Sequence, residues 1–188
     1  EYFSIFFATF CILILINGSN FIDGTNLIVS GYYLILAIIL ISFGNLDNLY
    51  FFEIKISYLI IPLLLIFILN SINKIYLGDS GSYLLGFIFG FELINFYNQS
   101  EVSPFFIILL LWYPCFEMLF SIFRKLNFNK SPLRPDSKHF HQLLYYFINK
   151  KFKNSTISSS LSGLFINIYN LIIFLISTSS PAHTQFLI

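Results

Sequence analysis

The stretch PFFIILLLWYPCFEMLFSIF, residues 104–123, decides the class of fold. It carries a single charged residue, Glu117, and it is long enough to cross a membrane, because a helix of about 20 residues spans an apolar bilayer core roughly 30 Å thick. Pro104 suits the first turn of a helix, and neighbouring helices can satisfy the carbonyl that an internal proline such as Pro114 leaves free. We therefore predict a membrane-spanning helix over these residues.

Five further apolar runs have a similar character, at residues 3–16, 27–43, 56–72, 82–96 and 161–177. The whole chain is 57% hydrophobic and 10% charged, whereas soluble domains have roughly 45–50% apolar and about 25% charged residues. The sequence thus predicts an all-α polytopic membrane helical bundle with about six transmembrane helices. We expect one integral-membrane domain over residues 1–188, with a large polar loop at 124–160. The net charge of +1 carries no information about nucleic acid, and we expect no nucleic-acid partner.

The basic residues indicate which side of the membrane the loops occupy. If the spans alternate, the loops after the first, third and fifth spans share one side, and that side holds every lysine and arginine except Lys55. Loops rich in lysine and arginine remain in the cytosol. We therefore expect a multi-pass protein of the cell membrane whose loop at 124–160 is cytosolic.

The first polar motif of that side is NGSNFIDG, residues 17–24. In a helix, residues spaced i, i+3 and i+6 share one face, so Asn17, Asn20 and Asp23 are expected to line up, and Gly24 permits an immediate turn. A helix cap followed by a turn is the structural alternative. Two carboxamides aligned with a carboxylate exceed what a cap requires, which favours a binding function.

The second motif, GDSGS at residues 78–82, opens the fourth apolar run. Asp79 in this motif could serve only as a helix cap. However, small residues and free amide groups at a helix start also form phosphate sites, and a carboxylate beside phosphates favours Mg²⁺. Ser82, Gly86 and Gly90 follow at four-residue spacing, which indicates close helix packing.

The third motif lies in the large loop and reads SPLRPDSKHFHQ, residues 131–142. His139 and His141 are two positions apart, a spacing that places side chains on one face of a strand or an irregular loop. Arg134 and Lys138 beside them favour anions. A zinc site would need a third nitrogen or sulfur ligand, and none is apparent. Ordinary surface histidines are the remaining alternative.

Two carboxylates lie inside predicted spans. Glu117 follows Pro114 by three residues, and carboxylates within a membrane are candidate functional groups. Glu92 lies near the outer end of the fourth run, where its side chain could reach the interface.

Together, the three motifs resemble those of the polyprenyl-phosphate N-acetylhexosamine-1-phosphate transferases, glycosyltransferase family four. This family includes undecaprenyl-phosphate N-acetylglucosamine-1-phosphate transferase and phospho-N-acetylmuramoyl-pentapeptide transferase. Its members carry N-x-x-N-x-x-D-G, then G-D-x-G-S-x-x-L-G, then a histidine motif, and the match covers residues 17–144. The histidine motif at residues 135–141 is more similar to the branch that starts O-antigen, enterobacterial common antigen and teichoic acid linkers. The resemblance implies the C-terminal part of such an enzyme in a bacterial inner membrane.

The resemblance also implies a reaction and its residues. The oxygen of a polyprenyl phosphate would attack the β-phosphorus of a UDP-N-acetylhexosamine and release UMP, in the first membrane step of O-antigen or another cell-envelope polysaccharide. Mg²⁺, or alternatively Mn²⁺, would be held by Asp79 and Asp23, and a homodimer is an assembly that the resemblance leaves open. The implied catalytic residues are Asp23, Asp79, His139 and His141, and the implied substrate-binding residues are Asn17, Asn20, Gly78, Ser80, Gly81, Arg124 and Lys138.

The chain departs from the family pattern in two places. Asn26 stands where the family often has a second aspartate, and the family's D-D-x-x-D motif would lie upstream of Glu1. We therefore expect the chain alone to be inactive. The alternatives are a truncated, non-catalytic remnant and a membrane transporter subunit. The second is disfavoured, because transport sites lie near the bilayer midplane whereas these motifs gather at one interface.

Overall fold

A computed structural model describes residues 2–43, 50–51, 54–129 and 138–187. Over these residues the fold is all-α, apart from two short antiparallel strands, β1 (Tyr50–Phe51) and β2 (Ile54–Lys55). A 3-10 turn at Ile56–Leu59 leads into α3. The helices are α1 (Tyr2–Ile22), α2 (Ile28–Ser42), α3 (Ile60–Ser71), α4 (Gly78–Gln99), α5 (Pro104–Asn127), α6 (Phe140–Phe152), α7 (Ser155–Thr178) and α8 (Thr184–Leu187).

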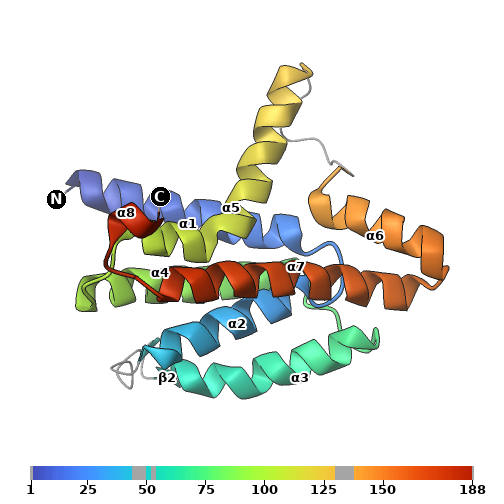
Figure 1. Cartoon of the computed structure of the whole chain (residues 1–188), viewed down its shortest axis with the longest axis horizontal. Helices are drawn as coiled ribbons and strands as arrows, with labels where there is room; N and C mark the ends of the chain where they lie inside the picture. Colours follow the sequence, from blue (N-terminus) through green and yellow to red (C-terminus); the bar gives the residue numbers. More distant parts are fainter. Residues whose placement is uncertain (1, 44–49, 52–53, 130–137, 188) are drawn as a thin grey trace.

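Five of the helices, α1, α2, α3, α4 and α7, run along the long axis of the molecule (Figure 1). The last turns of α1 and α3 and the first turns of α2, α4 and α7 come together at one end, where α6 also lies (Figure 1). The first polar motif ends α1 and the second opens α4, so the chain brings them to the same end. Each of the six predicted apolar runs forms a helix. The segment treated as a loop contains α6, a helix that the apolar pattern did not predict.

The apolar character of the surface agrees in part with the predicted spans. Helices α5 and α7 are each long and apolar enough to cross a membrane, with only 33% and 39% of their most apolar windows buried. Residues 8–22, 28–42 and 56–71 form shorter apolar helices. Two long and three shorter apolar helices among the described residues therefore account for five of the six predicted spans by composition.

Small residues bring α1 and α4 into close contact. A Cβ atom added to Gly86 would lie 2.9 Å from Cα of Ile16, and one added to Gly90 would lie 3.2 Å from Cδ2 of Leu15. The close packing predicted from the spacing of these glycines is confirmed. The side chains of Tyr33 and Phe89 pack beside this contact, with ring centroids 4.8 Å apart.

Helix α5 accommodates an internal proline with the help of two other helices. Pro114 has no N–H group, so the carbonyl of Leu110 loses its intrahelical partner. The hydroxyl of Tyr32 in α2 donates a hydrogen bond to this carbonyl, which confirms that a neighbouring helix satisfies it. Gly18 of α1 leaves room for the proline, since an added Cβ would lie 2.5 Å from the Pro114 carbonyl oxygen. The last part of α5 then stands clear of the bundle (Figure 1).

Candidate functional site

Polar side chains surround a cavity of about 490 Å³ at the end of the bundle where the motifs meet. Its walls come from the turn after α1 (residues 23–26), from Asn70 and Asn73, from residues 76–79, from Tyr145 of α6, and from Ser155 and Ser159 of α7. The first two sequence motifs, which lie far apart in the chain, thus share one cavity.

Asp23 and Asp79 are the two carboxylates of this cavity. Burial raises the pKa of Asp23 to about 6, and the negative charge of Asp79 adds to the increase. Asp79 lies in the first turn of α4 and is exposed, and among the described residues no side chain caps that helix. The helix-cap interpretation of Asp79 therefore fails, and the residue lines the cavity instead. Gly78 beside it has a φ of +66°, a backbone conformation that favours glycine.

The remaining residues of the first two motifs lie outside the cavity wall. Asn20 links α1 to α4, because its Nδ2 donates to the hydroxyl of Tyr83 over 2.7 Å. Nδ2 of Asn17 donates to the Leu13 carbonyl of its own helix, and this side chain is exposed. Ser80 is exposed as well, and Gly81 packs against Leu77, where an added Cβ would lie 2.7 Å from Cγ.

Asparagine side chains hold the turn that carries Asp23. Leu27 at its end has a φ of 70°, and its N–H donates to Oδ1 of Asn70 over 2.5 Å while its carbonyl accepts from Nδ2 of Asn167 over 2.7 Å. The Asn26 amide nitrogen Nδ2 donates to Oδ1 of Asn73. These contacts connect the turn to α3, to the α3–α4 connection and to α7.

Helix α7 also shapes this turn directly. The backbone N–H of Asn26 donates to Oγ of Ser159 over 2.9 Å. An added Cβ on Gly163 would lie 1.9 Å from the Asn26 carbonyl oxygen, so only glycine permits this approach. Contacts from α3, from the α3–α4 connection and from α7 therefore hold the turn, which gives Asp23 a defined position.

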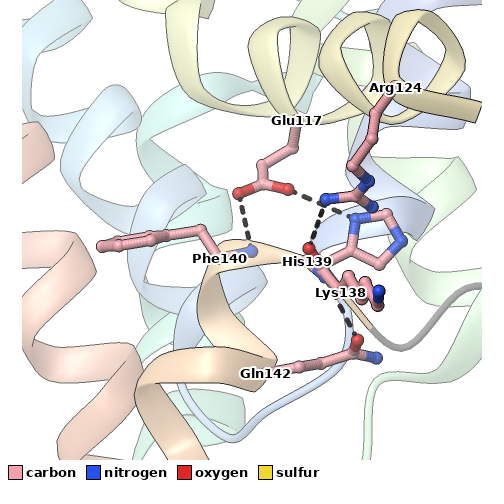
Figure 2. A network of polar contacts seen from close by, with 6 residues as sticks. All are labelled: Glu117, Arg124, Lys138, His139, Phe140 and Gln142. Carbon is pink, nitrogen blue, oxygen red and sulfur yellow. Dashed lines mark hydrogen bonds and ion pairs between the residues drawn. The ribbon is translucent and has the colours of Figure 1, made fainter. Parts of the chain in front are cut away.

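Residues 138–142 of the third motif form a second polar group with side chains of α5 (Figure 2). Nδ1 of His139 lies 3.2 Å from Oε2 of Glu117, and the Phe140 N–H donates to Oε1 of the same carboxylate over 3.1 Å. Arg124 donates to the carbonyl of Lys138 over 2.6 Å. Glu117 and His139 are only 3% and 7% exposed, so this pair is enclosed between α5 and the start of α6.

His141 connects the two groups. Its ring is fully buried and stacks on His139, with centroids 5.5 Å apart and planes 5° from parallel. On the other side it contacts Gly24, because a Cβ added to Gly24 would lie 2.1 Å from Nε2 of His141. Burial lowers the pKa of His141 to about 4; the Glu117 carboxylate opposes this shift and His139 adds to it.

The structure thus divides the residues singled out from the sequence into two groups. Asp23, Gly24, Gly78 and Asp79 line the cavity, whereas the other residues implied by the resemblance lie outside its wall. Those others are Asn17, Asn20, Ser80, Gly81, Arg124, Lys138, His139 and His141. Arg134 and Asp136 of the third motif fall outside the described residues.

Sequence reasoning missed part of the site. It gave Glu117 no partner, although the acid and the histidine motif were both noticed. It also passed over Asn70 and Asn73, whose three-residue spacing at the end of an apolar run was an available signal. Glu92, expected to reach the interface, is fully buried, and neither carboxylate oxygen has a hydrogen-bond partner among the described residues.

The carboxylates suit a divalent cation that also binds a substrate. Within the described residues, no group of three or more His, Cys, Asp or Glu side chains is arranged to hold a metal. Mg²⁺, however, is usually bound by one or two carboxylates together with substrate phosphates. Two carboxylates on one polar cavity, close enough for Asp79 to raise the pKa of Asp23, fit that requirement.

Comparisons with known proteins point in the same direction. A decaprenyl-phosphate N-acetylglucosaminephosphotransferase of Mycolicibacterium smegmatis is 32% identical over 152 residues, covering 69% of this chain and 37% of that protein. The protein of the same description from Mycobacterium tuberculosis is 30% identical, with 69% and 38% covered. An undecaprenyl-phosphate alpha-N-acetylglucosaminyl 1-phosphate transferase of Escherichia coli is 26% identical, with 76% and 41% covered.

The chain spans less than half the length of these curated relatives. No solved structure matches it. Residues 1–97, more than half of the chain, match the model of the family described as glycosyl transferase family 4, and this match includes both motifs that line the cavity. The chain therefore belongs to glycosyl transferase family 4.

Proposed function

We propose that this chain forms part of an enzyme that transfers an N-acetylhexosamine-1-phosphate from a UDP-sugar to a polyprenyl phosphate. One observation carries the proposal. Asp23 and Asp79 come from two separate motifs of the family, and they line the same cavity at one end of an apolar helix bundle. The names of the relatives, which describe N-acetylglucosamine phosphotransferases acting on decaprenyl and undecaprenyl phosphate, support the same class of substrates.

In the proposed reaction, an oxygen of the polyprenyl phosphate attacks the β-phosphorus of the UDP-sugar. A new P–O bond forms, the bond from the β-phosphorus to the bridging oxygen breaks, and UMP leaves with the electron pair of that bond. Asp23 and Asp79 would hold Mg²⁺ or Mn²⁺, which neutralises charge on the diphosphate when bound. Gly78 and Asp79 at the start of α4 line the same cavity, and free amide groups at a helix start favour anions.

A membrane location supports the lipid substrate. The exposed apolar surfaces of α5 and α7 fit lipid tails, and the polar cavity lies at one end of the bundle, where a lipid phosphate at the membrane surface can reach it. We propose that this end faces the cytosol of a bacterium, because the loops of that side hold nearly all lysines and arginines. The product would begin O-antigen or another cell-envelope polysaccharide.

The test is the substitution Asp79→Asn in the full-length natural protein. The variant keeps the size of the side chain but removes a charge, so Mg²⁺-dependent release of UMP should fall at least a hundredfold while membrane insertion is unchanged. The exposed Glu101, which follows the opposite end of α4, provides the matched control Glu101→Gln, which should keep full activity. Unchanged activity of Asp79→Asn would refute the metal assignment. A wild-type protein without UMP release would favour the non-catalytic alternative.

A further inference from the structure

We propose that Glu117 is a positioning residue, which keeps a proton on Nδ1 of His139 and thereby directs Nε2 toward an anionic phosphate oxygen of the substrate. The proposal rests on the function proposed above. It assigns a task to a carboxylate that lies outside the cavity and touches no substrate.

The first argument comes from the hydrogen bonds of Glu117. Both of its oxygens are engaged, Oε1 with the N–H of Phe140 and Oε2 with Nδ1 of His139 (Figure 2). The N–H of Phe140 belongs to the first turn of α6, where the helix dipole favours a negative charge. A carboxylate at this place accepts both hydrogen bonds. An ionised carboxylate has no proton to donate, so with an ionised Glu117 the hydrogen of this contact lies on Nδ1 of His139.

The second argument comes from the position of the ring. His139 stacks on His141 on one face, and Phe21 meets its ring edge-on with centroids 5.4 Å apart. The backbone N–H of His139 donates to Oε1 of Gln142 over 3.3 Å, which fixes the start of α6. These contacts restrict rotation of the imidazole, so the proton position alone decides what each nitrogen offers.

The third argument concerns Nε2 and its surroundings. Among the described residues, no side chain is hydrogen-bonded to Nε2 of His139, although the His139 side chain is only 7% exposed. The cationic side chains nearby come from α5: Arg124 bonds the carbonyl of Lys138, and Nζ of Lys125 lies 5.9 Å from the centroid of the Phe21 ring. With the proton of Nδ1 held by Glu117, a phosphate oxygen can share a second proton at Nε2, and the resulting imidazolium is stabilised by Glu117.

A purely structural role is the competing explanation, because Glu117 also caps α6. The substitution Glu117→Gln separates the two. Glutamine can still accept the Phe140 N–H through Oε1, so the cap remains. Its amide would instead donate to Nδ1, which moves the proton of a neutral His139 to Nε2 and opposes the imidazolium.

The experiment is ¹⁵N NMR of histidine-labelled, full-length protein at alkaline pH, where the imidazoles are neutral, with the His139 signal assigned from its loss in His139→Gln. We expect the Nδ1–H tautomer in the wild type and in Glu117→Asp, and the Nε2–H tautomer in Glu117→Gln. UMP release by Glu117→Gln should fall about 10–100-fold. Glu92→Gln, which alters another buried carboxyl group, should change neither measurement.

Each outcome of these measurements either supports or contradicts the role proposed for Glu117. An Nε2–H tautomer in the wild type or in Glu117→Asp would overturn the proposal, as would a shifted tautomer in Glu117→Gln with full activity. If Glu117→Gln does not fold, the wild type and Glu117→Asp still decide the tautomer. The spectrum is recorded without substrate, so it judges Glu117 even if the wild type releases no UMP, a result that would instead refute the proposed function.

Discussion

Gly24 and His141 lie in direct contact, although they belong to different sequence motifs. A Cβ added to Gly24 would lie 2.1 Å from Nε2 and 2.7 Å from Cδ2 of the imidazole. His141 is fully buried, and neither ring nitrogen has a hydrogen-bond partner among the described residues. The ring of His141 therefore packs against the turn that carries Asp23 and supports it. The φ of Gly24 is not in the left-handed region, so the backbone conformation does not require a glycine at this position. The glycine is needed because a side chain there would prevent the close approach of His141.

Gly24→Ala should therefore destabilise the protein. The added methyl group must displace a buried ring or the turn itself, and overpacking of this kind costs about 1–3 kcal/mol. Thermal unfolding of the purified protein in detergent measures the loss. Gly90→Ala is the matched control and should cost less stability, because its Cβ would lie 3.2 Å from the flexible end of Leu15 and 3.5 Å from Cγ1 of Ile12.

A double-mutant cycle identifies the cause of that loss. Adding His141→Ala to Gly24→Ala frees the space that the methyl group needs, so the double variant should be more stable than the sum of the two single effects predicts. Strictly additive effects would show that the Gly24 methyl group strains something other than His141.

The buried imidazole of His141 should also make the protein sensitive to acid. Its pKa is about 4 in the folded protein and about 6.5 in an unfolded chain, so below pH 6.5 the unfolded state binds more protons. The free energy of unfolding should then decrease as the pH falls from 6.5 to 4, by up to roughly 3 kcal/mol. Melting temperatures between pH 8 and pH 4.5 should fall less steeply in His141→Leu. The exposed His183 provides the control His183→Leu, and equal slopes in all three proteins would contradict the assignment.

The sequence was sufficient to predict the helices of the apolar runs but not the contacts between motifs. Long apolar runs predict helices, because the burial of apolar side chains and the hydrogen bonding of backbone groups both act over many residues. All six runs form helices. Helix α6 was missed because it is short and carries two lysines and an asparagine among its apolar residues. Its amphipathic pattern follows directly after a proline-containing segment, whose composition is typical of a loop.

For the site, the spacing of residues within one motif predicted which of them share a helix face. The separation of two motifs along the sequence did not predict which of their residues are in contact. The alignment of Asn17 and Asn20 on α1 follows from helical periodicity. The contacts of Glu117 with His139 and of Gly24 with His141 depend on how α1, α5 and α6 pack, and no single-sequence pattern specifies that packing. The family resemblance grouped these residues by function without indicating that His141 is buried.

Asn26 offers a test of the asparagine contacts around the Asp23 turn. Asn26→Asp replaces the Nδ2 donor by a carboxylate oxygen, which would face Oδ1 of Asn73. Asn73 can rotate its amide by half a turn, because its present partner Thr156 accepts from Nδ2 over 2.7 Å through a hydroxyl that can also donate. We therefore expect Asn26→Asp to cost little stability alone.

Thr156 then becomes essential in the Asn26→Asp protein. Thr156→Val removes the hydroxyl that the rotated Asn73 amide needs as a donor, so the double variant should lose about 1–3 kcal/mol more than the two single variants together. Melting temperatures of the four proteins measure this coupling. An additive result would show that the Asn73 amide does not rotate.

The hydrogen bond from Tyr32 to the Leu110 carbonyl makes a prediction that depends on Pro114. Tyr32→Phe leaves that carbonyl without a partner inside the bundle, which should cost roughly 1–2 kcal/mol. Pro114→Ala restores an N–H group that can donate to the same carbonyl within α5. In the Pro114→Ala protein, Tyr32→Phe should therefore cost much less, and unfolding of the four proteins in detergent gives the difference. An equal cost of Tyr32→Phe in both proteins would mean that the Tyr32 hydroxyl stabilises the fold through other contacts. The hydrogen bond to the Leu110 carbonyl would then not be needed to accommodate Pro114.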